Sequence, residues 1–327
     1  MRRFALALLA WAPLIAHATP TPQQRADAAR LTAEQARACV AAQPFYWEIG
    51  DATQPLASGQ AGDNAPTRDT DMAIASASKW LYSAFVAERR QGRLTPEDVK
   101  FLHFQSGYTN YRVCRRDQTI QDCQESPLNG RGRKDAATEN RFAYGGGHMQ
   151  QHAILMGLGS MGPDGLAQAV RQALAPALGN DWQLRYSQAM PAGGGVTSAA
   201  NYSRFLRALL DGRLQLAPLL GTQAVCTNAQ ACPDDAVKTP LPQSLQWHYS
   251  LGHWVEDDPR TGDGAFSSPG AFGFYPWISA DRHNYGIVAR EQRSGMLSNS
   301  PTSKPAVASA ACGREIRAAW MDGQPRR

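Results

Sequence analysis

The chain has 327 residues, with 33 lysines and arginines against 28 aspartates and glutamates and a formal net charge of +5 at pH 7. Such a small and scattered excess of positive charge argues against a nucleic-acid partner. The length suits one large domain or two smaller ones.

The first residues have the pattern of a secretory signal peptide. Arg2 and Arg3 precede an apolar stretch over residues 4–15, and Ala16-His17-Ala18 provides a cleavage site of the small-x-small type. The stretch is too short to span a bilayer, and no cysteine just beyond the cleavage site offers a lipid anchor. We therefore expect removal of residues 1–18, secretion to the periplasm, and a monomer without a stable membrane anchor.

A helix and a strand are predicted next. Residues 21–42 are rich in alanine, glutamine and arginine, which favour a helix, and aromatic and aliphatic residues make 45–50 strand-like. Residues 59–70 are expected to form a polar connection.

The stretch Met72–Trp80 joins a short apolar run to the start of a helix, and it contains Ser76 and Lys79. Apolar residues at helical spacing predict that this helix runs to about Arg90. Residues three apart lie on the same face of a helix, so the Lys79 amine can sit beside the Ser76 hydroxyl. Backbone N–H groups at a helix N-terminus favour a developing oxyanion. A desolvated, neutral lysine one turn away can activate the serine as a nucleophile.

This pair also has a simpler explanation. A chain of this length contains Ser-x-x-Lys about once by chance, in which case Ser76 would cap the helix and Lys79 would lie in solvent. Of the five lysines in the chain, only Lys79 has a serine three residues before it. Partner motifs further along the chain have to decide between the two interpretations.

The middle of the chain predicts helices joined by polar and glycine-rich loops. We expect a helix start near residues 94–98, an ordered polar loop over 111–140, a loop over 142–149 that leads into a helix reaching about Leu158, helices at Asp164–Leu178 and Ala199–Leu210, and a turn at Pro191–Gly195.

Strand patterns return near the end of the chain, at Trp247–Glu256, Phe272–Ile278 and Tyr285–Arg290, before a closing helix at Lys304–Met321. Strands at both ends with helices between them predict an α/β (α+β) fold. In this fold an antiparallel sheet, assembled from both termini and flanked by helices, carries a helical insertion.

We expect residues 19–327 to form a single domain. Its sheet part would comprise about residues 22–75 and 240–327, and its helical part about residues 76–239.

Six cysteines in an exported chain indicate disulfides rather than catalytic thiols, and none of them forms a Cys-x-x-Cys metal motif. Six cysteines allow fifteen pairings. Spacing favours Cys114–Cys123 and Cys226–Cys232, which leaves Cys39 to pair with Cys312. The first two would close local loops, and the third would tie the two ends of the chain together.

Three motifs resemble those of the serine β-lactamase and penicillin-recognising family, especially its class C β-lactamase and esterase-like branch. Ser76-Ala77-Ser78-Lys79 matches the nucleophile motif, and Tyr144-Gly145-Gly146 resembles the second motif, Tyr-x-Asn. Ser268-Pro269-Gly270 resembles the third, Lys-Thr-Gly or His-x-Gly. Their order is that of the family, and the likeness covers most of the mature chain.

The resemblance implies a role for each motif. Tyr144 would take or pass a proton beside Ser76, where the Lys79 ammonium would favour a phenolate. The N–H groups of Ser76 and Ala271 would hold the oxyanion, and Gly270 would allow close backbone approach on an edge strand. No cofactor is implied.

Two departures from the family bear on the substrate. Gly146 stands where an asparagine would contact the substrate, and Ser268 stands where a cation usually sits. A substrate carboxylate would lose a charged partner worth about 1.5–3 kcal/mol, which favours esters or amides over penicillins. Arg290 and Arg293 follow the last strand and are candidates to supply that charge instead.

Other residues compete with these assignments. Tyr108-Thr109-Asn110 is a literal Tyr-x-Asn that we rank second to Tyr144, and Lys238-Thr239-Pro240 lacks the glycine of the third motif and is expected in a loop. His148 and His152 are four apart on a predicted helix. Without a third ligand nearby, packing explains them better than a metal site.

The sequence therefore predicts an exported serine hydrolase that acts through an acyl-enzyme on a small-molecule or peptide ester, amide or lactam. The alternative is a non-hydrolytic cell-wall or ligand-binding protein that keeps the fold.

Overall fold

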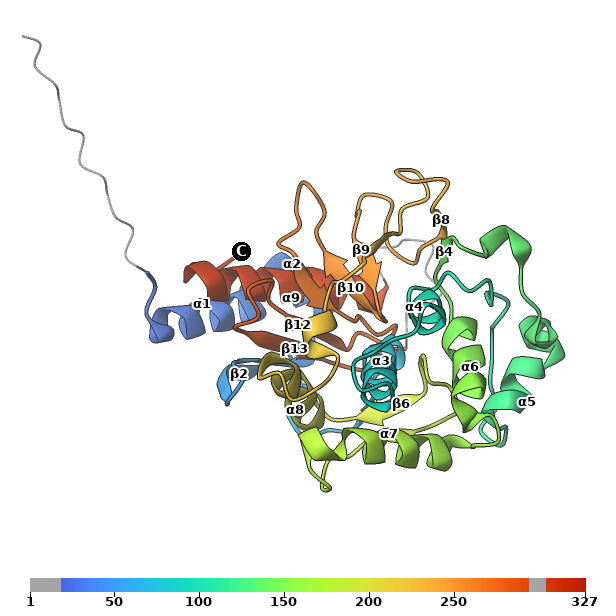
Figure 1. The fold of residues 1–327 in the computed structure, drawn as a ribbon. Helices are drawn as coiled ribbons and strands as arrows, with labels where there is room; N and C mark the ends of the chain where they lie inside the picture. The colour runs from blue at the N-terminus through green and yellow to red at the C-terminus, as the bar shows by residue number, and fades with distance from the viewer. Residues whose placement is uncertain (1–18, 294–303) are drawn as a thin grey trace, which may run out of the picture.

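The computed structural model of the protein describes residues 19–293 and 304–327, so the expected signal peptide lies outside the described residues. Its largest sheet has eight strands in the order β2-β1-β13-β12-β11-β10-β9-β7, all paired antiparallel. The first strands of the chain therefore lie beside the last, which confirms the predicted sheet built from both termini (Figure 1). These strands are β1 (Phe45–Gly50), β2 (Pro55–Ala61), β7 (Val225–Cys226), β9 (His248–Ser250), β10 (His253–Glu256), β11 (Ala265–Ser267), β12 (Tyr275–Ile278) and β13 (Tyr285–Ala289).

Helices cover the sheet and build the rest of the molecule (Figure 1). The α-helices are α1 (Pro22–Gln35), α2 (Arg37–Ala42), α3 (Ser78–Arg89), α4 (Pro96–Leu102), α5 (Ile120–Glu125), α6 (Gly147–Ala153), α7 (Pro163–Leu178), α8 (Ala199–Leu210) and α9 (Pro305–Asp322). Short strands form two further pairings: β3 (Met72–Ala73), β6 (Gly195–Thr197) and β5 (Arg185–Tyr186) in one sheet, and β4 (Phe142–Ala143) with β8 (Ala236–Lys238) in the other.

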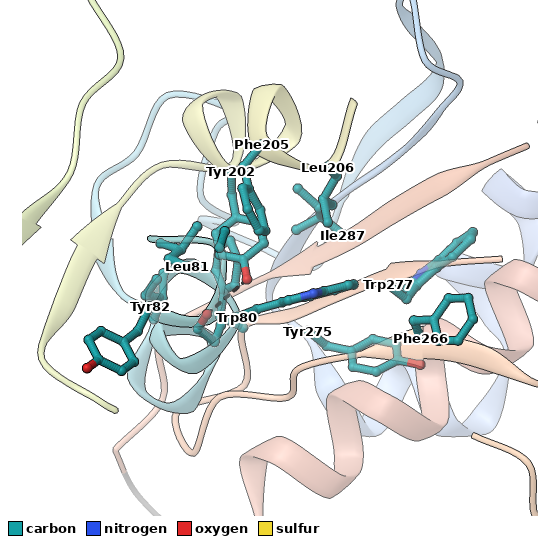
Figure 2. Close-up of a cluster of buried hydrophobic side chains, with 14 of the residues drawn as sticks. Trp80, Leu81, Tyr82, Tyr202, Phe205, Leu206, Phe266, Tyr275, Trp277 and Ile287 are labelled. Carbon is teal, nitrogen blue, oxygen red and sulfur yellow. Dashed lines mark hydrogen bonds between the residues drawn. The ribbon is translucent and has the colours of Figure 1, made fainter. Parts of the chain in front are cut away.

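The helix α3 lies at the centre of the molecule, and its residues from Ser78 to Ala87 are buried. Trp80 of α3, Tyr202 and Phe205 of α8, and Tyr275 of β12 gather in one apolar cluster (Figure 2). Burying a large aromatic or aliphatic side chain stabilises a fold by about 1.5–3 kcal/mol. The cluster therefore fixes α3, and with it the turn containing Ser76 that leads into α3, against the sheet.

The terminal helices pack together at the other side of the sheet, where α1 and α2 lie against α9. The structure brings all three expected cysteine pairs together. Their Cα–Cα distances are 4.5 Å for Cys39–Cys312, 5.1 Å for Cys114–Cys123 and 6.5 Å for Cys226–Cys232. None of the helices that the structure describes has the length and apolar run needed to traverse a bilayer.

Several predicted elements differ from the observed ones. The helix expected over residues 21–42 breaks at Ala36, whose ψ of 136° is extended. Residues 59–61, expected in a polar connection, belong to β2, where Gly59 pairs with Trp47. The stretch Trp247–Glu256 is a hairpin of β9 and β10, because Leu251 and Gly252 both have positive φ and reverse the chain.

The loop and insertion boundaries also shift. The loop expected over 111–140 contains α5, which begins with a capping box at Thr119. The strand β7 comes from the part expected to be helical and pairs with β9. The strand expected over 272–278 begins only at Tyr275, because a turn at 270–273 precedes it.

Candidate active site

The nucleophile turn is held in place by backbone contacts from distant segments. Ser76 lies in a short 3₁₀ turn, Ala75–Ala77, that runs into α3. The Ile74 N–H donates to the Gly195 carbonyl at 3.0 Å, and the Gly195 N–H donates to the Ser78 hydroxyl at 3.0 Å. Ala75 has a φ of +43°, a left-handed conformation that a non-glycine residue keeps only where its surroundings enforce it.

Lys79 is buried beside Ser76 without an acidic partner. Its side chain is 4% exposed, and its Nζ lies 3.0 Å from Ser76 Oγ and donates to the Ala192 carbonyl at 2.7 Å. Within the described part of the chain it forms no ion pair. Because burial disfavours the ammonium, the pKa of Lys79 falls to about 7. A large fraction of this amine is therefore neutral at pH 7 and able to accept a proton.

Tyr144 lies directly after β4, where its N–H donates to the Lys238 carbonyl at 2.9 Å. Its ring stacks on Trp254 at 5.5 Å, and the Lys79 Nζ lies 4.9 Å from the ring centre. Burial raises the pKa of Tyr144 to about 12, although its hydrogen bond with Ser76 acts the other way. Burial outweighs the partly protonated amine beside it, so at neutral pH a phenol is favoured over the expected phenolate.

The third motif lies in a turn between β11 and β12, and both strands are inside the sheet. The expectation of an edge strand at Gly270 is therefore wrong. A side chain at position 270 would collide with the Ile74 carbonyl, so glycine lets this turn close on the nucleophile turn. Neither the Ser76 nor the Ala271 N–H donates to another described residue, so both remain open to a ligand.

Ser268 was expected to face the substrate, but it lines neither cavity at Ser76. It is buried, and its hydroxyl donates to the Ser76 carbonyl at 3.2 Å. Its N–H donates to the Pro276 carbonyl at 3.2 Å, which fixes it beside β12. Ser268 thus supports the backbone of Ser76, and a lysine at this position would bury a cation.

Two cavities meet at Ser76 and Ala271, which line both of them. The first, which we call the apolar cavity, has a volume of about 310 Å³. Its wall includes Tyr144, Trp254 and, from the N-terminal half of α9, Val307. Its remaining lining is Pro240, Leu241, Pro242, Leu245, Trp247, Pro269, Lys304, Pro305, Ala306, Ala310, Ala311 and Arg314.

The second, which we call the polar cavity, has a volume of about 650 Å³ and contains Lys79 in its wall. Its charged lining residues are Asp71, Lys79, Arg112, Arg116, Glu291 and Arg293, and its other polar ones include Tyr111, Ser187 and Gln188. A carbonyl attacked by Ser76 would therefore have one substituent in apolar and one in charged surroundings.

Another side chain occupies the space beside Gly146, where the second motif usually has an asparagine. A Cβ placed on Gly146 would lie 3.2 Å from Cδ1 of Tyr111, so the Tyr111 ring occupies the space beside it. Tyr111 lines the polar cavity, and sequence analysis did not single it out. The only sign of this in the sequence was Gly146 itself, which leaves room where the family motif has an asparagine.

The competing residues line neither cavity at Ser76. Tyr108 stacks on Phe101 at 5.8 Å, and both ring nitrogens of His148 are bonded, to the Ser106 hydroxyl and the Ala143 carbonyl. His152 likewise contacts Asp98 and Tyr82. No group of metal-binding side chains is found among residues 19–293 and 304–327.

Two basic candidates need correction. Lys238, expected in a loop, belongs to β8 and pairs with Ala143. Arg290 is buried and donates to the Ala42 carbonyl, and it lines neither cavity at Ser76. Arg293 does line the polar cavity, but it pairs with Glu291 at 2.7 Å.

Solved structures resemble the whole described fold. A candidate β-lactamase from Bacteroides dorei DSM 17855 is 22% identical, with a TM-score of 0.61 over 84% of this chain and 93% of its own. The chain has the β-lactamase fold. The D-amino acid amidase from Ochrobactrum anthropi SV3 is 13% identical, with a TM-score of 0.63 over 90% and 98% of the two chains. EstCE1, a hydrolase with promiscuous acyltransferase activity, is 13% identical, with a TM-score of 0.59 over 88% and 99%.

These likenesses confirm the fold expected from the three motifs. No protein-family model and no curated protein sequence matches the chain. At such low identities these likenesses show the fold alone.

Proposed function

We propose that the protein is an exported serine hydrolase that forms an acyl-enzyme on Ser76 with an ester or amide substrate. The observation that carries the proposal is the buried Lys79 amine, 3.0 Å from the Ser76 hydroxyl and lowered in pKa to about 7. An amine in this state can act as a general base at neutral pH.

The geometry supports the following sequence of steps. The neutral Lys79 amine takes the Ser76 proton while Oγ bonds to the substrate carbonyl carbon. The Ser76 and Ala271 N–H groups stabilise the oxyanion. As the bond to the leaving group breaks, the leaving atom takes a proton from the Tyr144 phenol, and the Lys79 ammonium returns one to Tyr144.

Water then releases the acyl group by the reverse route. It adds to the acyl carbonyl as its proton passes to the Tyr144 oxygen and the Tyr144 proton moves to the neutral Lys79 amine. The bond to Oγ then breaks, and the Lys79 ammonium returns that proton to Ser76. The products are a carboxylic acid and an alcohol or amine. Each step uses groups of this chain, and no cofactor takes part.

The structural neighbours support the substrate class, and the cysteine pairs support export. EstCE1 and the D-amino acid amidase are, by name, a hydrolase with acyltransferase activity and an amidase. The three cysteine pairs at disulfide distance suit an oxidising compartment, as does the sequence of residues 1–18. The protein would act on its small substrate as one domain and as a monomer.

Covalent labelling tests the proposal. Wild-type protein exposed to a fluorophosphonate should gain one adduct by intact-mass spectrometry, Ser76→Ala should gain none, and Ser187→Ala should be labelled like wild type. Ser187 is a matched control because it lines the same polar cavity, but its hydroxyl donates to the Gly194 carbonyl at 3.3 Å. Labelling of Ser76→Ala would refute the nucleophile, and an unlabelled wild type would favour the non-hydrolytic ligand-binding alternative.

A further inference from the structure

The polar cavity carries an excess of positive charge. Its two carboxylates already have cationic partners, since Asp71 pairs with Arg185 at 2.8 Å and Glu291 pairs with Arg293 at 2.7 Å. Glu291 also accepts the Ala73 N–H at 2.8 Å. Neither carboxylate is therefore available to neutralise a further cation.

Arg112 and Arg116 line the same cavity and have no ionic partner in the described part of the chain. Unpaired arginines in the wall of a cavity at a nucleophile favour an anionic ligand, because guanidinium binds carboxylates with paired hydrogen bonds. The apolar cavity differs: of its two cations, Arg314 lies 3.7 Å from Glu256 and stands over the Trp247 ring. The other is Lys304 at the start of α9.

The backbone that carries these arginines is anchored. The buried Asn129 side chain accepts the N–H groups of Arg112 and Val113 and donates to the Val113 carbonyl at 2.6 Å. The Cys114–Cys123 disulfide follows at once, and Gln188 of the cavity wall donates to the Cys114 carbonyl at 2.6 Å. Anchored backbone reduces the ordering cost when a ligand binds.

An unused donor belongs to Tyr111, the residue before Arg112 in the wall of the polar cavity. The Tyr111 hydroxyl is buried and has no hydrogen-bond partner among the described residues, and its side chain lines the polar cavity. Buried polar groups are nearly always satisfied, so an unpaired one at a cavity indicates an acceptor supplied by a ligand or by water. A carboxylate in this cavity would provide such an acceptor beside Arg112 and Arg116.

We propose that the polar cavity binds a carboxylate on the acyl part of the substrate through Arg112 and Arg116, so that half-esters of dicarboxylic acids and related anionic acyl groups are preferred. This inference rests on the proposed acyl-enzyme reaction. The positions of the two proton carriers indicate which cavity holds the acyl part. Tyr144, which gives a proton to the leaving atom, lines the apolar cavity, whereas Lys79 lines the polar one. The leaving group lies in the apolar cavity and the acyl chain in the polar cavity.

A matched substrate pair tests this preference. The half-ester p-nitrophenyl glutarate and its neutral methyl ester differ in charge but hardly in length. Wild type should hydrolyse the half-ester with about tenfold higher kcat/KM, which corresponds to about 1.4 kcal/mol. Raising the salt concentration should reduce this ratio, because exposed charges are screened beyond about 8–10 Å.

Two variants locate the effect. Arg112→Gln/Arg116→Gln should lower kcat/KM for the half-ester by about tenfold and change it by less than about twofold for the methyl ester. Arg115→Gln is the control, because Arg115 is exposed on the same loop but does not line the cavity. It should leave the ratio unchanged.

The outcomes separate this inference from the proposed function. Hydrolysis of both esters without a preference for the half-ester, or equal losses in the double variant and Arg115→Gln, would overturn the carboxylate site and leave the hydrolase intact. Failure to hydrolyse either ester together with no fluorophosphonate adduct would overturn both. A preference lost only in the double variant supports the site.

Discussion

The pH dependence of acylation gives the sharpest test of Lys79. If the pKa of the buried amine is about 7, its neutral fraction rises from about one-tenth at pH 6 to about nine-tenths at pH 8. The kcat/KM should therefore rise about tenfold over this interval and level off above pH 8. A lysine at its usual value of 10.5 would instead give a rise that continues to about pH 10.

The assay is hydrolysis of a neutral p-nitrophenyl ester between pH 5 and 10, corrected for spontaneous hydrolysis, since kcat/KM reports the ionisation of the free enzyme. Lys79→Arg serves as the control because a guanidinium stays protonated, and it should lose the pH-dependent rate. A wild-type profile that is level between pH 6 and 8, or that inflects near 10, would refute the role given to Lys79.

The same burial predicts a stability cost. Between pH 7 and 10.5 the unfolded chain binds the Lys79 proton and the folded chain does not. The free energy of unfolding therefore rises with pH across that window. At pH 7 the cost is on the order of 4 kcal/mol. Lys79→Met should accordingly raise the Tm at pH 7 while abolishing activity, and its advantage should shrink towards pH 10. A lower Tm than wild type at pH 7 would contradict the argument.

Two further predictions concern the frame of the site. Cys312→Ser should lower the Tm more than Cys226→Ser, because their bridges span 273 and 6 residues and the chain-entropy model gives about 5.6 against about 2.2 kcal/mol. Equal losses in Tm would contradict this prediction. Gly270→Ala should reduce kcat/KM in the same ester assay at least about tenfold, because the added Cβ would displace the nucleophile turn. Gly145→Ala is the control and should be close to wild type, because its added Cβ would lie 3.8 Å from the nearest atom.

Local patterns in the sequence were enough for the frame and for the nucleophile pair. The three-residue spacing of Ser76 and Lys79 depends only on the helix between them, so the contact at 3.0 Å could be expected without a structure. Strands with several aromatic residues were also predictable. The short strand β11 and the break at Ala36 carry no local signal, because pairing partners and packing determine them.

The environment of the site could not be read from the sequence. The phenol state of Tyr144 depends on burial against Trp254, which is more than a hundred positions away in the chain. The acceptor of Lys79 is the Ala192 carbonyl, and a backbone atom leaves no mark in residue type. Ser268 had a plausible substrate role until the direction of its hydroxyl was known.

The glycines near Ser76 connect packing with reactivity. A Cβ on Gly195 would lie 2.6 Å from the Ser78 hydroxyl, and one on Gly270 would meet the Ile74 carbonyl, so the two segments close on the nucleophile turn from different parts of the chain. The segment of Gly195 also carries Ala192, whose carbonyl holds the Lys79 amine. If this packing loosened, water would reach Lys79 and its pKa would rise towards the usual value. Activity at pH 7 therefore depends on how tightly backbone packs around the serine as well as on the side chains that perform the chemistry.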